Sequence, residues 1–455
     1  MTLLLGLDIG STIVKATVFD LRGRVVATAG EPAAGRHPEP GRVERDPERT
    51  WRIVTAVLKR VANGRGADIA AVGVTGCGNG AVFLDRHKRP VMPGILSTDT
   101  RAVRVSKKVH ATPAQRPYPG QLPVLLRWLR ATKGSASRRM VHALFWKDYV
   151  RFRLTDSLAT DYTDAGAAGL LDFPSRKLRH PEPSLPEIRE SLARAGAVTR
   201  SAAALTNLAI GTPVFVGCID CEAAAIGSGV RRPGDISVVA GTWSINQSYT
   251  LTPPEGTRHF LVNVSAIPNR WLVLEASARS AVNFDWARKV LGGNLTEATQ
   301  EAAHAEHSEL LFLPGVPASA GAFVGLGPAH GRGDLFRAVM EGVVFAHRSH
   351  LDRLARSLGP TKRLCLTGGA STNRFWCQLF ADGLGCAVHV PRCTEVGTLG
   401  AAICASVGAG YFTSVTAAQK SMISGYRIYR PRPVHHAALT RSYRRFLRLS
   451  QHMSN

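Results

Sequence analysis

The chain has 455 residues, enough for two or three domains. Hydrophobic residues make up 45% and charged residues 20%, which excludes a disordered chain, a collagen and a small disulfide-rich scaffold. The 57 Lys and Arg outweigh the 33 Asp and Glu and give a formal net charge of +24, which attracts anions. Two interpretations stay open: general enrichment in arginine over all surfaces, and a surface for a polyanionic partner.

The first half of the chain predicts an α/β domain. A strand at 3–7, a polar turn at 8–12 and a second strand at 15–21 indicate a β-hairpin. Asp46 and Pro47 are typical of the start of a helix, here expected over 47–63. Further strands are expected at 69–74 and 81–84 around the loop Thr75–Gly80, and further helices at 122–131 and 140–153.

The rest of the chain completes the first domain and then opens a second one with another hairpin. A strand at 213–217 leads to Asp220 and a helix at 221–227, so the carboxylate follows the carboxyl end of a strand, where open α/β sheets bind ligands. A second hairpin, 236–251, turns at 241–244. The later elements expected are helices at 334–357, 374–384 and 397–408, and strands at 363–367 and 386–390. We expect two domains, residues 1–230 and 231–455, with a cleft between them.

Both hairpin turns carry groups that bind phosphate. The first turn offers backbone N–H groups, hydroxyls, a cation and a carboxylate that suits Mg²⁺, from Asp8, Gly10, Ser11, Thr12 and Lys15. No Gly-Lys-Ser/Thr follows, so the turn is not a Walker A loop. Gly241 and Thr242 offer similar donors without the carboxylate. An ordinary hairpin with a polar turn stays open as the alternative for each.

Three further sets of residues suit a nucleotide, an alcohol and a proton transfer. Gly368 and Gly369 let a flat group lie against the backbone, and Asn373 offers hydrogen bonds to a nucleoside or, alternatively, a helix cap. Asn79 and Asp99 suit the hydroxyls of a polyol. Asp220 suits a general base that accepts a hydroxyl proton during phosphoryl transfer, with a helix cap as its alternative.

Together these segments resemble the FGGY family of carbohydrate kinases. The resemblance runs from Leu5 to about Phe412 and is most specific over Gly321–Leu326 followed by Asp334–Gly342. Other matching segments are Gly6–Thr12, Glu44–Pro47 ahead of Trp51, Gly211–Asp220, Gly241-Thr242 and Gly368–Ala370 with Asn373.

The resemblance implies two ribonuclease-H-like domains of the actin and hexokinase type, with the active site in the cleft between them. It implies an ATP-dependent kinase in which Asp220 is the catalytic base and Asp8 lies near Mg²⁺. Ser11, Thr12 and Lys15 would contact phosphates from the first domain, Thr242 from the second, and Gly369 and Asn373 would line the adenosine pocket.

Within the family, the segments 95–102, 125–129 and 340–347 are most similar to L-xylulose kinases. This implies a ketopentose substrate such as L-xylulose, with erythritol, D-xylulose and ribulose as alternatives. Cys77 stands where the family usually has Gln, on the sugar side of the site. An alternative of a different class is a non-catalytic actin-like or nucleic-acid-binding protein, although nucleic acid is not the partner we expect.

The cysteines and the apolar segments indicate in which cellular compartment the protein works. Eight cysteines lack a framework spacing, and Cys218 with Cys221 is a lone CxxC, which favours reduced thiols over disulfides or zinc. The N-terminal apolar run stops at Asp8 without a basic segment before it, unlike a signal peptide. The uncharged stretches 201–219 and 396–419 are too polar for membrane spans. We expect a cytoplasmic protein without a membrane partner, and a homodimer stays open.

Overall fold

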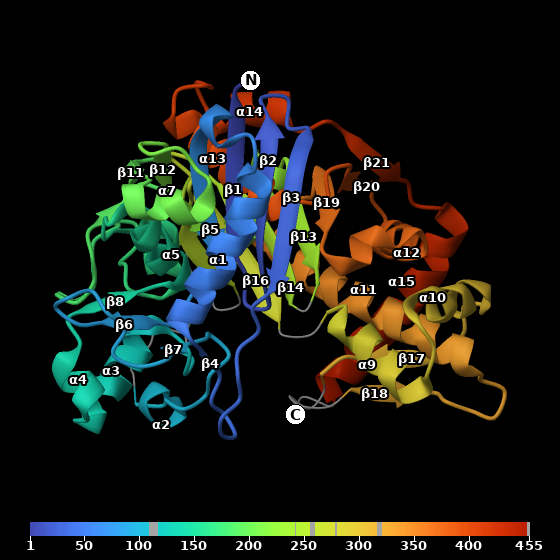
Figure 1. The fold of residues 1–455 in the computed structure, drawn as a ribbon. Coiled ribbons are helices and arrows are strands. Elements are labelled where there is room, and N and C mark those ends of the chain that lie inside the picture. The colour runs from blue at the N-terminus through green and yellow to red at the C-terminus, as the bar shows by residue number, and fades with distance from the viewer. Residues whose placement is uncertain (109–116, 242, 255–259, 278–279, 316–320, 453–455) are drawn as a thin grey trace. The chain divides into compact units, whose positions relative to one another are not determined.

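The computed structural model divides into two compact units (Figure 1). It describes all residues except 109–116, 242, 255–259, 278–279, 316–320 and 453–455. Unit 1 comprises Met1–Arg231, Thr250–Leu272 and Glu395–Ser424, and unit 2 comprises Arg232–Tyr249, Val273–Thr394 and Gly425–Asn455. Two segments from the second half of the sequence thus pack with unit 1. The functional domains expected at 1–230 and 231–455 stay a prediction.

The central sheet of unit 1 has the strand order β11-β12-β5-β1-β2-β3. The predicted first hairpin is confirmed, because β1 and β2 are antiparallel, with Asp8 opposite Lys15. Strands β1, β5 and β12 run parallel to one another. The bounds are β1 (Leu3–Ile9), β2 (Ile13–Asp20), β3 (Val25–Pro32), β5 (Ile69–Gly76), β11 (Arg194–Ala197) and β12 (Pro213–Ile219).

Alternate residues of β1 serve two different faces of this sheet. Leu3, Leu5 and Leu7 join a core that includes side chains of α1 (Pro47–Ala62) and α5 (Trp146–Thr155). Helix α1 begins as predicted, since the Asp46 side chain accepts hydrogen bonds from the backbone N–H groups of Glu48 and Arg49 at 2.8 and 3.2 Å. The opposite face, on which Gly6 lies, carries α13 (Val396–Gly408).

Helix α13 lies directly on the sheet because glycines leave room for its backbone. Gly6 and Gly73 are paired across β1 and β5. A Cβ atom on Gly6 would come within 1.8 Å of the Thr398 carbonyl oxygen, and one on Gly73 within 2.0 Å of the Ala401 carbonyl oxygen. Gly227 in α8 (Asp220–Ser228) meets the Val396 carbonyl oxygen in the same way, at 1.9 Å. These positions therefore admit no side chain while α13 keeps its place.

One segment of unit 1 differs from the prediction. Residues 140–153 were expected to form one helix, but His142–Leu144 is strand β8, which pairs antiparallel with β6 (Val82–Leu84). The helix, α5, begins only at Trp146. The prediction was wrong here because the pairing with β6 buries Ala143 and Leu144, and a contact 60 residues away overrides the local helical pattern.

The second sheet has the strand order β15-β16-β14-β13-β19-β20-β21. Its strands β13, β19, β20 and β21 belong to unit 2, whereas β15 and the start of β16 lie in the unit 1 segment Thr250–Leu272. The predicted second hairpin is confirmed as β13 (Asp235–Ala240) with β14 (Ser244–Thr250), and β19 (Arg363–Thr367) runs parallel to β13. The helices α11 (Arg332–Leu358) and α12 (Arg374–Leu384) match the expected ones. The other strands of this sheet are β15 (Leu261–Val264), β16 (Trp271–Ser277), β20 (Val388–Pro391) and β21 (Tyr426–Tyr429).

The remaining elements connect or cover these sheets. They are β4 (Glu44–Arg45), β7 (Gly94–Ile95), α2 (Val103–Ser106), α3 (Leu122–Thr132), α4 (Ser135–Arg139), β9 (Thr160–Asp161), α6 (Tyr162–Ala167), β10 (Ile188–Arg189), α7 (Arg200–Thr206), α9 (Val282–Leu291), α10 (Leu295–His304), β17 (Leu311–Leu313), β18 (Ala322–Val324), α14 (Val415–Met422) and α15 (Pro433–His452), with short 3₁₀ turns at Gly66–Asp68 and Gly369–Thr372. Among the described helices, none combines the length and the apolar character needed to cross a membrane.

The close contact between α13 and the glycines of β1 and β5 gives a stability prediction. Gly73→Ala should cost about 3 kcal/mol, the upper end of the usual cost of overpacking, because the new methyl group meets backbone atoms that move only with the whole helix. The measurement is the urea midpoint of the purified protein. Gly30→Ala in β3 is the matched control, since a Cβ atom there makes only ordinary contacts of 3.6 Å and longer. Equal midpoints for the two variants would contradict the close approach of α13.

Candidate active site

The strand register brings two of the predicted acidic residues to one edge of the unit 1 sheet. Asp8 of β1 pairs with Thr75 of β5, and Thr75 pairs with Cys218 of β12. Asp220 follows two residues after Cys218, as the first residue of α8. Because the three strands are parallel, their carboxyl ends meet at the same edge. Asp8 and Asp220 therefore lie on either side of the end of β5. Asn79 lies in the loop that follows β5.

The Asp8 carboxylate is only partly satisfied by the protein. Its Oδ1 atom is buried and has no hydrogen-bond partner among the described residues. Burial and, to a smaller extent, the negative charge of Asp220 together raise the pKa of Asp8 to about 7, although Lys15 counteracts both. The Lys15 ammonium is itself paired with Glu395 Oε2 at 2.9 Å. An unpaired carboxylate oxygen beside a second carboxylate fits a divalent cation, held directly or through water.

Asp220 has the properties of a general base. Its Oδ1 atom accepts a hydrogen bond from the Cys221 backbone N–H at 2.7 Å, and Oδ2 has no partner in the part of the chain that the structure describes. Burial raises the pKa of Asp220 to about 6, and the Cys221 N–H counteracts this rise. The carboxylate is therefore ionised at neutral pH yet basic enough to take a proton from a nearby hydroxyl.

Asn79, the first predicted sugar ligand, is buried in the loop that follows β5, and its role in sugar binding stays a prediction. It has a positive φ of 61°, and its side chain is 6% exposed, with Oδ1 unpartnered among the described residues. Its amide interacts with the Tyr118 hydroxyl, a group that the sequence gave no reason to choose. The two segments meet because Gly80 N–H donates to the Gly120 carbonyl at 2.9 Å. Burial raises the pKa of the neighbouring Cys77 thiol to about 12, so this thiol is neutral.

Asp99, the other predicted sugar ligand, makes internal bonds. Its Oδ2 atom accepts from the Val43 backbone N–H at 2.7 Å, and both oxygens accept from the Arg101 guanidinium at 2.8 to 3.0 Å. The side chain of Asp99 is 1% exposed. These bonds fasten the segment that precedes β4, and a role of Asp99 in sugar binding stays a prediction.

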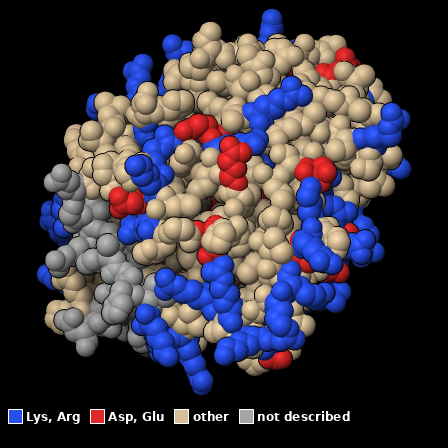
Figure 2. All heavy atoms as spheres, turned by 90° about the vertical axis from the view of Figure 1, so that its left-hand side faces the viewer, with Lys and Arg blue, Asp and Glu red and all other residues tan. Residues whose placement is uncertain are grey.

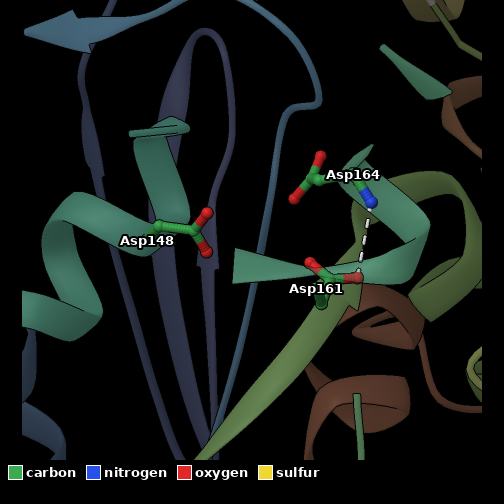
Figure 3. Close-up of side chains that lie close together, drawn as sticks. All are labelled: Asp148, Asp161 and Asp164. Carbon is green, nitrogen blue, oxygen red and sulfur yellow. Dashed lines mark hydrogen bonds between the residues drawn. The ribbon is translucent and has the colours of Figure 1, made fainter. Parts of the chain in front are cut away.

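A buried group of three carboxylates lies beneath this edge. Asp148, Asp161 and Asp164 turn their carboxylates toward one another (Figure 3) and offer oxygen atoms within 4.8 Å of one another, a spacing that suits a metal ion. The Lys147 ammonium, however, lies 2.7, 2.5 and 2.9 Å from one oxygen of each. The ammonium occupies the place that a metal cation would take, so the group is an ion cluster rather than a metal site.

The charges of this ion cluster balance internally. Burial alone would lower the pKa of Lys147, but the three carboxylates raise it. Arg151 adds a second cation, 2.9 Å from Asp148. Burial raises the pKa of Asp164 well above its usual value, although Lys147 counteracts this rise.

The ion cluster also fixes the backbone beside Asp220. The Asp161 carboxylate accepts from the Thr163 backbone N–H at 2.8 Å and from the Thr163 hydroxyl. The same hydroxyl accepts from the Ile219 backbone N–H at 2.9 Å. Sequence reasoning missed this support, because Lys147, Asp161 and Ile219 have no local pattern that links them.

In unit 2, Gly241, Gly368 and Gly369 gather at the carboxyl ends of β13 and β19, which pair with Val239 opposite Thr367. Gly368 has a φ of +84°, and a Cβ atom there would meet the backbone of Ala240 at 2.7 Å, whereas Gly369 and Gly241 adjoin open space. Asn373 caps α12, with its Oδ1 atom accepting from Trp376 N–H at 3.1 Å and its amide donating to Thr299. Thr242 lies outside the described residues.

Two family models match the chain: the N-terminal domain of the FGGY family of carbohydrate kinases over residues 3–227 and its C-terminal domain over residues 236–409. This chain belongs to the FGGY family of carbohydrate kinases. It is therefore an ATP-dependent phosphotransferase with the α/β two-domain fold of sugar kinases, as the resemblance implied.

Individual relatives cover nearly the whole chain. The L-xylulose/3-keto-L-gulonate kinase of Escherichia coli strain K12 is 28% identical over 98% of this chain and 96% of its own. The autoinducer-2 kinase of Klebsiella pneumoniae is 26% identical over 96% of this chain and 91% of its own. The crystal structure of xylulose kinase from Rhodospirillum rubrum is 26% identical, covers 99% of both chains and has a TM-score of 0.88.

The ion cluster gives a second stability prediction. Lys147→Met should cost about 3–5 kcal/mol, because it leaves buried carboxylates without their shared cation. The measurement is again the urea midpoint. Lys88→Met is the matched control, because Lys88 pairs with an Asp156 side chain that is 70% exposed, and such surface pairs contribute 1 kcal/mol or less. A Lys147 variant as stable as the control would show that the cluster is not held by this ammonium.

Proposed function

We propose that this kinase phosphorylates a ketopentose, with L-xylulose preferred, at the terminal hydroxyl farthest from the carbonyl. The observation that carries the proposal is the ionisable Asp220 carboxylate beside Asp8 at the carboxyl edge of β12, β5 and β1. The names of the Escherichia coli and Rhodospirillum rubrum relatives support a xylulose. The autoinducer-2 kinase shows that relatives at similar identity act on other substrates, so erythritol, D-xylulose and ribulose stay alternatives.

In this mechanism Asp220 accepts the proton of the attacking hydroxyl. The hydroxyl oxygen forms a bond to the γ-phosphorus of ATP while the bond from that phosphorus to the bridging oxygen breaks, and ADP leaves. Ser11, Thr12 and Lys15 contact the phosphates from unit 1. Lys15 exchanges its bond with Glu395 for one to a phosphate oxygen.

The proposal also assigns ATP contacts to the glycines of unit 2 and a Mg²⁺ ion to Asp8. Gly241 and Thr242 add phosphate contacts, Gly368, Gly369 and Asn373 bind adenosine, and Gly10 lets the first turn approach the phosphates closely. The unpartnered Asp8 Oδ1 fits Mg²⁺, which would neutralise charge on the phosphates. The cleft between the domains, the cytoplasmic location and a homodimer stay predictions.

The substrate claim is tested by coupled ADP release over L-xylulose, D-xylulose, L-ribulose, D-ribulose, erythritol and 3-keto-L-gulonate. The expected result is the highest kcat/KM for L-xylulose, with phosphate on the terminal hydroxyl distal to the carbonyl by NMR of the product. A higher kcat/KM for a tetritol or for the sugar acid would overturn the preference for a ketopentose.

The base is tested by substitution and by pH. Asp220→Asn should lower kcat about 10²- to 10⁴-fold, the usual contribution of a general base. In the native enzyme, kcat/KM should fall tenfold per pH unit below about pH 6, because protonated Asp220 cannot accept the hydroxyl proton. Asp46→Asn is the matched control, since Asn also caps helices well and Asp46 lies at the start of α1. A near-normal rate for Asp220→Asn would remove the assigned base.

One observation favours a second, additional property, the binding of a polyanion. Residues 86–139 contain 13 of the 57 cations but only one acidic residue, Asp99, so the positive charge is concentrated rather than spread evenly. Figure 2 shows Lys and Arg gathered over the lower part of the face on which α2, α3 and α4 lie. Ten of these cations are exposed: Arg86, Arg89, Arg104, Lys107, Lys108, Arg127, Arg130, Lys133, Arg138 and Arg139.

This basic surface predicts salt-sensitive binding of a polyanion, for which single-stranded RNA is a suitable probe. Single-stranded RNA should bind more weakly as salt rises from 50 to 200 mM, since the binding would release counterions. A triple variant, Arg127→Glu, Lys133→Glu and Arg138→Glu, should lower the affinity at least tenfold in fluorescence anisotropy. The control reverses three exposed arginines of α15, Arg441, Arg444 and Arg448, with the same change in net charge. Equal losses in both variants would assign the binding to net charge alone.

A further inference from the structure

Arg45 is a buried cation beside the first phosphate-binding turn. It ends the short strand β4, directly before the cap residue of α1, and its side chain is 5% exposed. Its guanidinium carbon lies 5.1 Å from the centre of the Trp146 ring. Among the described residues Arg45 has no carboxylate partner, which is unusual for a buried charge, and its Nε and Nη1 atoms have no acceptor there.

The Arg45 side chain binds the turn through backbone oxygens. Its Nη2 atom donates to the Gly10 carbonyl oxygen at 3.0 Å and to the Ser11 carbonyl oxygen. The next carbonyl, that of Thr12, accepts from the Ala33 backbone N–H at 2.7 Å. Three successive carbonyls of the turn are thus bonded to protein donors.

This bonding pattern determines where the N–H groups of the turn point. In a trans peptide the C=O and N–H bonds point in opposite directions. With the Gly10 and Ser11 carbonyls turned toward Arg45, the N–H groups of Ser11 and Thr12 point away from it. Both residues are exposed, and neither N–H donates a hydrogen bond within the described residues. Successive outward N–H groups of this kind form an anion-binding concavity.

We propose that Arg45 is a positioning residue that holds the 8–12 turn in its phosphate-binding form. The proposal rests on the proposed function, because it assigns this turn to the phosphates of ATP. Arg45 acts in two ways: it binds the two carbonyls that would otherwise repel a phosphate, and it places a permanent positive charge behind the turn. The planar guanidinium also lies over the Trp146 ring, a stacking contact that the compact ammonium of lysine does not reproduce.

The test separates the phosphate tail from the rest of the nucleotide. The inhibition constants of ADP and of adenosine, both competing with ATP, are measured for the native enzyme, Arg45→Gln and Arg45→Lys. Arg45→Gln should weaken ADP at least tenfold and leave adenosine and the KM for the sugar within twofold. Arg45→Lys should recover part of the loss, because it keeps a positive charge with N–H donors but loses the planar guanidinium over Trp146. Arg49→Gln is the control for loss of a nearby cation, since Arg49 is exposed on α1.

Each outcome bears on the proposal. Unchanged ADP inhibition in Arg45→Gln would overturn it. Parallel losses for ADP, adenosine and the sugar, together with a lower melting temperature, would show that Arg45 only stabilises the fold and would also overturn it. If the native enzyme released no ADP with any sugar, the proposed substrate class would fail, and ADP binding by the native and variant proteins, measured by calorimetry, would still decide the role of Arg45.

Discussion

Two carboxylates on one partly buried edge impose the main constraint on this site. Asp8 and Asp220 follow parallel strands that are both next to β5, and the charge of Asp220 raises the pKa of Asp8 above what burial alone would cause. The described residues leave one oxygen of each carboxylate without a partner. Such an arrangement is costly for a structural site, because unpaired buried charge destabilises a fold. In the proposed mechanism this cost is offset when a cation binds Asp8 and a hydroxyl binds Asp220.

The cations around this edge are arranged so that they do not neutralise the pair. Lys147 and Arg151 are balanced by the buried ion cluster beneath the sheet edge. Lys15 is paired with Glu395, and Arg45 donates to carbonyl oxygens instead of a carboxylate. Asp220 therefore keeps a pKa of about 6, close to the working range of a base, whereas a direct partner such as Lys147 would have lowered it.

Local sequence patterns predicted the parts of the site that local patterns control. The hairpin turns, the Asp46 cap and the position of Asp220 after a strand each depend on residues within a few positions of one another. The roles of Lys147, Tyr118 and Arg45 depend on contacts between segments 34 to 56 residues apart, such as Arg45 with Ser11 and, beside the ion cluster of Lys147, Thr163 with Ile219. The error at His142–Leu144 has the same cause, since only its pairing with β6 makes that segment a strand.

Different parts of the fold hold the residues proposed for the reaction and those proposed for the choice of substrate. Asp8 and Asp220 are held by the strands themselves, by the helix that lies on Gly6 and Gly73, and by the ion cluster. The proposed sugar side, in contrast, lies on loops: Asn79 and Cys77 follow β5, and Tyr118 comes from a segment joined to them through Gly80 and Gly120. Substitutions in these loops leave the sheet edge intact. If these loops choose the sugar while the sheet edge carries the phosphoryl transfer, relatives of similar identity are expected to act on different substrates, as the names of two of them indicate.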